Sequence, residues 1–130
     1  MSTTPAPDAY AALLQIDVRG HGGGHAEASV TVAEHHLNPH GTAHGSFLFS
    51  LAGIALAAAA NDAEHSGVVS AVHIDYVRPA RPGDTLVATA RVAERLPKED
   101  LFEVRVTHGD ELVARASGRA NRRLRAPRVD

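Results

Sequence analysis

Residues 36–46 place histidines, an asparagine and glycines directly ahead of a long apolar run. The segment reads His-Leu-Asn-Pro-His-Gly-Thr-Ala-His-Gly-Ser. Its proline and glycines predict a loop that delivers polar side chains and free backbone N–H groups to the start of a helix. The positive end of a helix dipole attracts negative charge, so such a junction suits an anion or an oxyanion. The same pattern fits an ordinary capped core helix, and spacing alone leaves both readings open.

The apolar run, residues 47–61, predicts one central buried helix. From Phe47 to Ala60 it has no charged side chain and a single hydroxyl, that of Ser50. A helix without a polar stripe must be surrounded by protein. The run is shorter than the roughly 20 apolar residues that span a bilayer. Four consecutive alanines, residues 57–60, make a narrow cylinder that a sheet can approach closely.

Alternating apolar and polar residues predict strands around this helix. We expect them at residues 16–19, 26–34, 68–77, 85–92, 102–107 and 112–120. The glycine-rich residues 20–25 are expected to form a turn, and Asp8 is expected to cap a short helix that carries Tyr10. The late strands are joined by short turns and are therefore antiparallel neighbours. The predicted class is α+β, an antiparallel sheet of five to six strands wrapped around one long central apolar helix.

Length and composition indicate one domain. The chain has 130 residues, 44% of them hydrophobic, which suits a single core. We expect a disordered N-terminus over residues 1–9, a single domain over residues 10–122, and a flexible basic tail over residues 123–130. The arginines near that end would be solvated or, alternatively, would clamp a phosphate. Because one sheet layer covers the helix poorly, an oligomer is expected.

The charge balance and the absence of cysteine exclude several function classes. A formal net charge of −2 gives no electrostatic footprint for nucleic acid. The lack of cysteine excludes disulfides, a thiolate nucleophile and a cysteine-based zinc site. The N-terminus lacks the basic and apolar regions of a signal peptide, so a cytoplasmic location is expected, without a membrane partner.

The sequence resembles the phenylacetate-degradation thioesterases of the PaaI type. The matching segments are residues 36–38, 43–52, 60–61, 74–79 and 83–86, in the order and spacing of that family. The resemblance spans about residues 10–122 and implies the hotdog fold. It also implies hydrolysis of aryl- or phenylacetyl-type acyl-CoA thioesters by a homotetramer, a dimer of dimers with sites between subunits. No cofactor is implied beyond coenzyme A as part of the substrate.

The chain departs from the family motif H-G-G-x-x-x-x-L-A-D at two positions. Gly53 stands where the family has the aspartate that acts as general base or nucleophile, and Ser46 replaces the second glycine. Serine keeps the backbone N–H that, by resemblance, polarises the thioester carbonyl. Nothing replaces the carboxylate, so hydrolysis is expected to lose at least the ~10²–10⁴ of general-base catalysis. Because glycine costs a helix about 1 kcal/mol relative to alanine, Gly53 indicates either loss of the acid or room for a bulkier ligand.

The resemblance also assigns roles to residues around this motif. Asn38 would orient water or the carbonyl, the N–H groups of Gly45 and Ser46 would hold the oxyanion, and Gly53 would line the acyl pocket. We assign substrate binding to Phe47, Ser50, Asn61 and His73. The strand position of His73 leaves open whether it faces the cleft or solvent.

His44 has two readings. A neutral imidazole beside the positive helix end could accept a proton. The family carries this histidine together with its aspartate, which favours a structural role instead. The hydroxyls of Ser46 and Ser50 would need an adjacent base to act as nucleophiles, and none stands at helical spacing.

The remaining hypotheses concern metals and other function classes. His36, His40 and His44 suggest a metal site, but Pro39 and the glycines interrupt their spacing and the family needs no metal, so none is expected. Acyl-thioester dehydratases and hydratases pair a histidine with a carboxylate, and no such pair is apparent. A binding protein for acyl-CoA or another small molecule, without hydrolysis, stays an alternative. The arginines that would hold the CoA phosphates are not singled out by the sequence.

Overall fold

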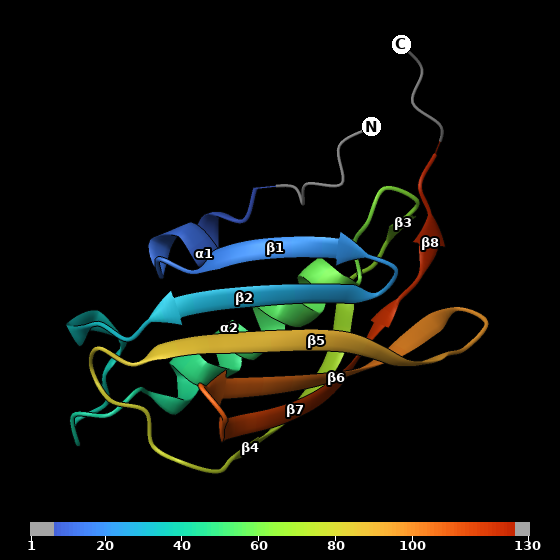
Figure 1. Cartoon of the computed structure of the whole chain (residues 1–130). Helices are drawn as coiled ribbons and strands as arrows, with labels where there is room; N and C mark the ends of the chain where they lie inside the picture. The colour runs from blue at the N-terminus through green and yellow to red at the C-terminus, as the bar shows by residue number, and fades with distance from the viewer. Residues whose placement is uncertain (1–6, 127–130) are drawn as a thin grey trace.

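The computed structural model describes residues 7–126, which form a six-stranded sheet with one long helix across one face (Figure 1). The strand order is β1-β2-β5-β6-β7-β4, and every neighbouring pair is antiparallel. The strands are β1 Asp17–Gly22, β2 His25–Thr31, β4 Val69–Tyr76, β5 Thr85–Arg95, β6 Glu99–His108 and β7 Glu111–Asn121. The predicted α+β architecture is therefore confirmed.

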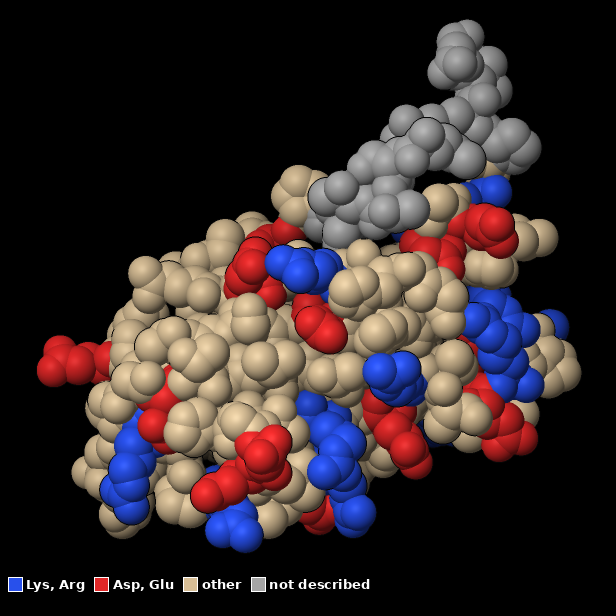
Figure 2. Space-filling view, viewed as in Figure 1, with Lys and Arg blue, Asp and Glu red and all other residues tan. Residues whose placement is uncertain are grey.

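The long helix α2, Gly45–Ala59, packs its apolar side on the inner face of the sheet. That inner face is rich in alanine, including Ala26 and Ala28 on β2 and Ala88 and Ala90 on β5, all fully buried. Small side chains on the sheet, like the alanines near the end of the helix, allow a close approach. Residues at alternate positions on the same strands point outward, and acidic and basic side chains are interspersed on this outer face (Figure 2).

One side of α2 is left uncovered within the chain. Phe49 is 43% exposed, Ser46 is exposed, and Ser50, Gly53 and Ala57 are only half-buried. We call these five residues the open stripe of α2. The sequence predicted this poor coverage by a single sheet layer, and the second subunit expected to complete the burial of the helix stays a prediction.

The short helix α1, Ala9–Leu13, touches the open stripe. It begins at the predicted cap, where the Asp8 carboxylate accepts a hydrogen bond from the Ala11 N–H at 2.9 Å. The hydroxyl oxygens of Tyr10 and Ser50 lie 2.9 Å apart. This contact connects the start of the chain to the middle of α2.

Several boundaries differ from the predictions. β1 continues through Gly22, so only Gly23 and Gly24 form the turn, both with positive φ (62° and 78°). β2 ends at Thr31 and is followed by the 3₁₀ turn η1, Glu34–His36. The glycine content of residues 20–25 could not predict the extent of β1, because a bulged hairpin can hold glycines inside its strands.

The predicted flexible tail is ordered at its start. β8, Arg123–Leu124, pairs with β3, His65–Ser66, and the Arg125 Nε–H donates to the Asp62 carbonyl at 2.7 Å. Backbone pairing and a charge-assisted hydrogen bond hold residues 123–125 in place, although their polar sequence predicted a flexible segment. The rest of the predicted tail, residues 127–130, and residues 1–6 of the predicted disordered N-terminus lie outside the described residues. Over residues 7–126, no helix is long and apolar enough to cross a membrane.

Candidate active site

Asn38 organises the loop ahead of α2. Its Oδ1 accepts hydrogen bonds from the backbone N–H groups of His40 at 2.9 Å and Thr42 at 3.2 Å, and its Nδ2 donates to Thr42 Oγ1 at 2.9 Å. Two backbone donors aimed at one atom identify that atom as the amide oxygen. An amide nitrogen carries two hydrogens. Within residues 7–126, the second Nδ2–H of Asn38 has no hydrogen-bond partner, while its carbonyl oxygen holds the loop.

His36 anchors the same loop in the core. It is 2% exposed, its Nδ1 accepts from the Ala33 N–H at 2.9 Å, and its Nε2–H donates to the Leu14 carbonyl at 2.8 Å. Burial lowers the pKa of His36 below its ordinary value, with the nearby His35 acting in the same direction. With both nitrogens engaged, the neutral ring offers no ligand atom to a metal, so His36, His40 and His44 do not assemble as one site.

Phe47 lies against that histidine rather than in a pocket. The two rings are stacked, with centroids 3.9 Å apart and an interplanar angle of 13°, and Phe47 is 5% exposed. This differs from its assignment to substrate binding. The first turn of α2 directs residue 47 toward the core.

His44 caps α2. Its Nδ1 accepts a hydrogen bond from the Ser46 N–H at 3.0 Å, so in the neutral ring the proton sits on Nε2. This arrangement makes the outward nitrogen a donor rather than a base. It also engages the Ser46 N–H, which the sequence analysis assigned to the oxyanion, and that role stays a prediction.

Gly45 holds the helix start against β4. Its carbonyl accepts a hydrogen bond from the Tyr76 hydroxyl at 2.9 Å, and a Cβ at this position would lie 3.2 Å from the Tyr76 ring. Within residues 7–126, the Gly45 N–H has no hydrogen-bond partner. Glycine thus permits the close approach of Tyr76 and presents a free donor at the positive end of α2.

Asn38 and Gly45 meet in one cavity of about 290 Å³. Its lining comes from the loop, the start of α2 and the end of β4: Asn38, Ala43, Gly45, Leu48, Tyr76, Val77, Arg78 and Pro79. We call it the donor cavity, because it is lined by Asn38 and Gly45, each of which has an N–H without a partner in residues 7–126. Arg78 is 59% exposed at its side chain and lies 3.9 Å from Glu111, which places a cation at the rim.

Gly53 and Ser50 line a second cavity, of about 490 Å³, which we call the stripe cavity. It is mostly apolar and includes Tyr10, Phe49 and Val72. A Cβ built on Gly53 would meet no atom within 4 Å. The position that the family motif gives to a carboxylate is therefore open space in this chain.

The Ser50 hydroxyl is not activated as a nucleophile. Its hydrogen is donated to the Ser46 carbonyl at 2.9 Å, so the Tyr10 hydroxyl donates to its oxygen. Neither partner is a base that could remove the serine proton. Ser50 serves as a polar wall of the stripe cavity.

The two cavities are separate within one chain. Gly45 and Gly53 are eight residues apart on α2, which is about 12 Å along the axis at 1.5 Å per residue. Neither lines the other's cavity. Gly45 and Gly53 therefore do not line a common cavity in a single copy of the chain.

Asn61 and His73 line neither cavity. The Asn61 amide closes the end of α2 by donating to the carbonyls of Ala57 at 2.8 Å and Gly67 at 2.9 Å. The side chain of His73 is 72% exposed and lies 3.2 Å from Asp75 Oδ1. Its neighbours Val72 and Ile74 pack against the core, and strand alternation then turns His73 to the outer face. Both placements differ from the substrate-binding assignment.

The cavity-lining residues to which the sequence assigned no role include Tyr10, Tyr76 and Arg78. Tyr76 and Arg78 stand in the matched segment 74–79, but an aromatic residue on a strand is usually a packing residue. Tyr10 reaches α2 from a distant helix, and no local pattern signals that contact.

Residues 40–115 match the thioesterase superfamily, which is more than half of the chain. The chain belongs to the thioesterase superfamily. It is 37% identical over 116 residues to the acyl-coenzyme A thioesterase PaaI of Escherichia coli, an alignment that covers 88% of this chain and 83% of that protein. The thioesterase superfamily comprises thioester hydrolases, so the predicted enzyme class is confirmed.

Solved structures agree with the superfamily assignment. The structure of E. coli PaaI, from the phenylacetic acid degradation operon, matches with a TM-score of 0.83 over 89% of this chain and 85% of that chain. A variant of the phenylacetic acid degradation protein PaaI from Thermus thermophilus is 32% identical, with a TM-score of 0.83 over 88% of this chain and 98% of that chain. The predicted PaaI resemblance and hotdog fold are confirmed.

Proposed function

We propose that this chain is an acyl-CoA thioesterase of PaaI type whose hydrolysis is slowed by Gly53. One observation carries the proposal: Asn38 and Gly45, each with an N–H that has no partner in residues 7–126, line one cavity, while the stripe cavity has open space at Gly53, the position predicted for the family's carboxylate. Such a site can bind and polarise a thioester. It lacks the group that would take a proton from the attacking water.

The chemistry follows from these groups. The thioester carbonyl oxygen accepts hydrogen bonds from the Gly45 N–H and the Asn38 Nδ2–H, and the same donors hold the oxyanion after water adds to the carbonyl carbon. The C–S bond then breaks, the sulfur is protonated, and a carboxylate and free coenzyme A leave. Without a carboxylate at Gly53, the water proton passes to solvent, which forfeits about 10²–10⁴ in rate.

The lining of the stripe cavity suits an aryl-type acyl group. Tyr10, Phe49 and Val72 give the stripe cavity apolar and aromatic walls, and its 490 Å³ lies within the range of small-molecule sites. Arg78, at the rim of the donor cavity, suits a CoA phosphate because its guanidinium is always charged and forked. Coenzyme A enters as part of the substrate, and no other cofactor is proposed.

We further propose that the site is completed between subunits of a homotetramer, a dimer of dimers. The open stripe of α2 is not covered by residues 7–126, and the edge strand β4 ends at the exposed Tyr76, which the exposed Val77 follows. An exposed edge and an uncovered apolar stripe both favour pairing with another chain. A second copy could bring its donor cavity beside the stripe cavity of the first, and the mass in solution tests this. The cytoplasmic location stays a prediction.

The decisive experiment compares the native chain with Gly53→Asp. CoA release would be measured from phenylacetyl-, hydroxyphenylacetyl- and benzoyl-CoA, with Gly53→Asn as the matched control that adds similar bulk without a base. Open space at Gly53 accommodates either side chain at its Cβ. We expect Gly53→Asp to gain about 10²–10⁴ in kcat and Gly53→Asn to gain little.

Native turnover of about 1 s⁻¹ or more, unchanged in Gly53→Asp, would contradict the proposal. Another base would then have to serve the reaction, and His44→Ala would be the next variant. Equal gains in the aspartate and asparagine variants would also contradict it, because bulk rather than proton transfer would be responsible.

The same open space at Gly53 favours one alternative, an acyl-CoA binding protein without turnover. Both cavities would still hold the ligand, because neither needs a carboxylate for binding. Calorimetric titration of a non-hydrolysable acyl-CoA thioether, beside the rate measurement, separates the two functions. Tight binding with no detectable CoA release by the native chain would establish the alternative.

A further inference from the structure

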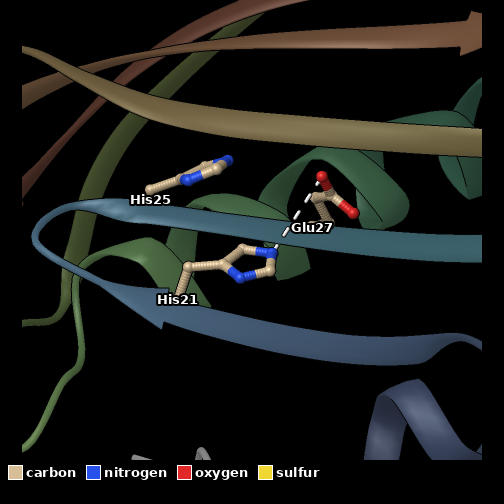
Figure 3. A group of neighbouring side chains, drawn as sticks. All are labelled: His21, His25 and Glu27. Atoms are coloured by element: carbon tan, nitrogen blue, oxygen red, sulfur yellow. Dashed lines mark ion pairs between the residues drawn. The ribbon is translucent and has the colours of Figure 1, made fainter.

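Three potential metal ligands converge on the hairpin between β1 and β2. His21 comes from β1, and His25 and Glu27 come from β2, with both imidazole rings pointing along the strands toward the carboxylate (Figure 3). One ligand atom from each lies within 4.8 Å of the others, and His21 Nε2 is 4.0 Å from Glu27 Oε1. The ring centroids are 4.6 Å apart. We call these residues the hairpin cluster.

A β-bulge brings the cluster together. Gly20 pairs with Ala26 and Gly22 pairs with His25, so His21 is an extra residue on β1. Ala26 and Ala28 face α2 and are fully buried, which directs His25 and Glu27 to the outer face of the sheet. Bulges commonly re-aim a side chain, and this one places His21 beside the two residues of β2.

The end of the hairpin is held in place. The Val92 N–H of β5 donates to the Gly24 carbonyl at 2.8 Å, and a Cβ on Gly24 would lie 2.7 Å from Val92 Cγ1. Gly24 also has a positive φ of 78°. Because the turn packs directly on β5, the cluster sits on a supported hairpin rather than a free loop.

His25 has a buried ring nitrogen, Nε2, that lacks a hydrogen-bond partner among the described residues. Burial lowers the pKa of His25, the charges of Arg91 and His21 lower it further, and Glu27 raises it. A buried imidazole nitrogen without a hydrogen-bond partner in residues 7–126 is costly for the fold and well suited to a metal ion.

We propose that His21, His25 and Glu27 bind one divalent transition-metal ion of the zinc class. Two imidazoles and one carboxylate form a ligand set that zinc accepts, with the fourth tetrahedral position left to water. Metal–ligand bonds of about 2.0–2.2 Å in a tetrahedral site place the ligand atoms about 3.4 Å from one another. Side-chain rotations that move these atoms by about 1 Å would therefore complete the site. This site is independent of the proposed thioesterase function, since the cluster lines neither cavity.

The surrounding charges set the expected strength. Glu27 supplies one negative charge, while Arg91 pairs with His25 and Arg19 pairs with Glu27 in the strand register. Two arginines beside a cation weaken its binding, so micromolar rather than nanomolar affinity is expected. The bound ion would tie the edge strand β1 to β2 and thereby stabilise the hairpin.

Zinc titration of the full chain tests the proposal. After EDTA treatment and buffer exchange, calorimetry with zinc chloride at neutral pH should give one ion per chain. His25→Ala and Glu27→Gln should each weaken binding by about tenfold or more, and Arg91→Ala should strengthen it. His40→Ala, which removes an exposed histidine outside the cluster, is the matched control and should bind like the native chain. Cobalt should also give the visible absorption bands of a low-coordinate site in the native chain and this control, but not in the cluster variants.

Absence of saturable zinc binding in the native chain would overturn the proposal. It would equally fail if Glu27→Gln and His25→Ala bound zinc as tightly as the native chain. Loss of binding in His40→Ala with retention in the cluster variants would place the metal elsewhere. Circular dichroism of each variant confirms that a lost signal reflects a lost ligand rather than unfolding.

Discussion

Replacing Gly53 by alanine should make the protein more stable. Gly53 lies inside α2, and a Cβ at this position would contact no atom within 4 Å. Its φ is not in the left-handed region, so alanine adopts the same backbone without strain. The substitution restricts the unfolded chain and improves helix propensity without disturbing the fold.

The magnitude follows from these two facts. Glycine is about 0.8–1.0 kcal/mol worse than alanine in a helix interior, and no clash offsets that gain. For a domain of this size, a gain of 1 kcal/mol corresponds to a rise in Tm of about 3–5 °C. Urea unfolding at fixed protein concentration should show a higher midpoint with an unchanged slope.

Gly118→Ala is the matched control of opposite sign. Its Cβ would lie 2.5 Å from Leu56 Cδ1 and 2.6 Å from the Ala71 carbonyl oxygen. Overpacking of this kind costs about 1–3 kcal/mol. If Gly53→Ala were also destabilising, position 53 would be packed against other atoms in solution. The inference that Gly53 leaves open space beside the stripe cavity would then be wrong.

Three further predictions concern other parts of the chain. Because the folded state lowers the pKa of His36, its contribution to stability should be complete above pH 6.5 and be lost as the pH falls below that value. The denaturant midpoint should therefore be lower at pH 5.5 than at pH 7.5, and His36→Gln should reduce this difference. Asp100 is 5% exposed and accepts from two arginines, so Asp100→Asn should lower the free energy of unfolding by about 2 kcal/mol, with an unchanged midpoint contradicting this. Gly45→Ala should cost about 1 kcal/mol by displacing the Tyr76 hydroxyl, and the cost should shrink in a Tyr76→Phe background, as a double-mutant cycle would measure.

The main elements were predictable because their patterns are local. The uncharged run that forms α2 and the alternation that forms β5 to β7 each identify their own structure, and the motif around Asn38 and Gly45 identifies the family. The donor cavity follows from that motif, since its two predicted members come from one loop and one helix start.

The missed features depend on contacts between distant segments or on local geometry that spacing does not show. Ser46 was expected to present its N–H, but the ring of His44 takes that hydrogen bond. His73 was placed near the site, but strand alternation turns it outward. The hairpin cluster was hidden because only a bulge brings His21 beside His25, and neither a bulge nor a buried nitrogen without a partner can be inferred from spacing.

The separation of the two cavities bears on how function could change in this chain. The donor cavity is lined by the loop of Asn38, the start of α2 and the end of β4, and Gly53 does not line it. Position 53 can therefore gain or lose a carboxylate while Asn38 and Gly45, the proposed ligands of the thioester carbonyl, stay in place. A slow thioesterase and an acyl-CoA binding protein would then share one structure and differ only in the rate at which water attacks the bound thioester. It follows that affinity for an acyl-CoA thioether should be nearly equal in the native chain and Gly53→Asn, whereas the rate of CoA release should respond to the carboxylate of Gly53→Asp alone.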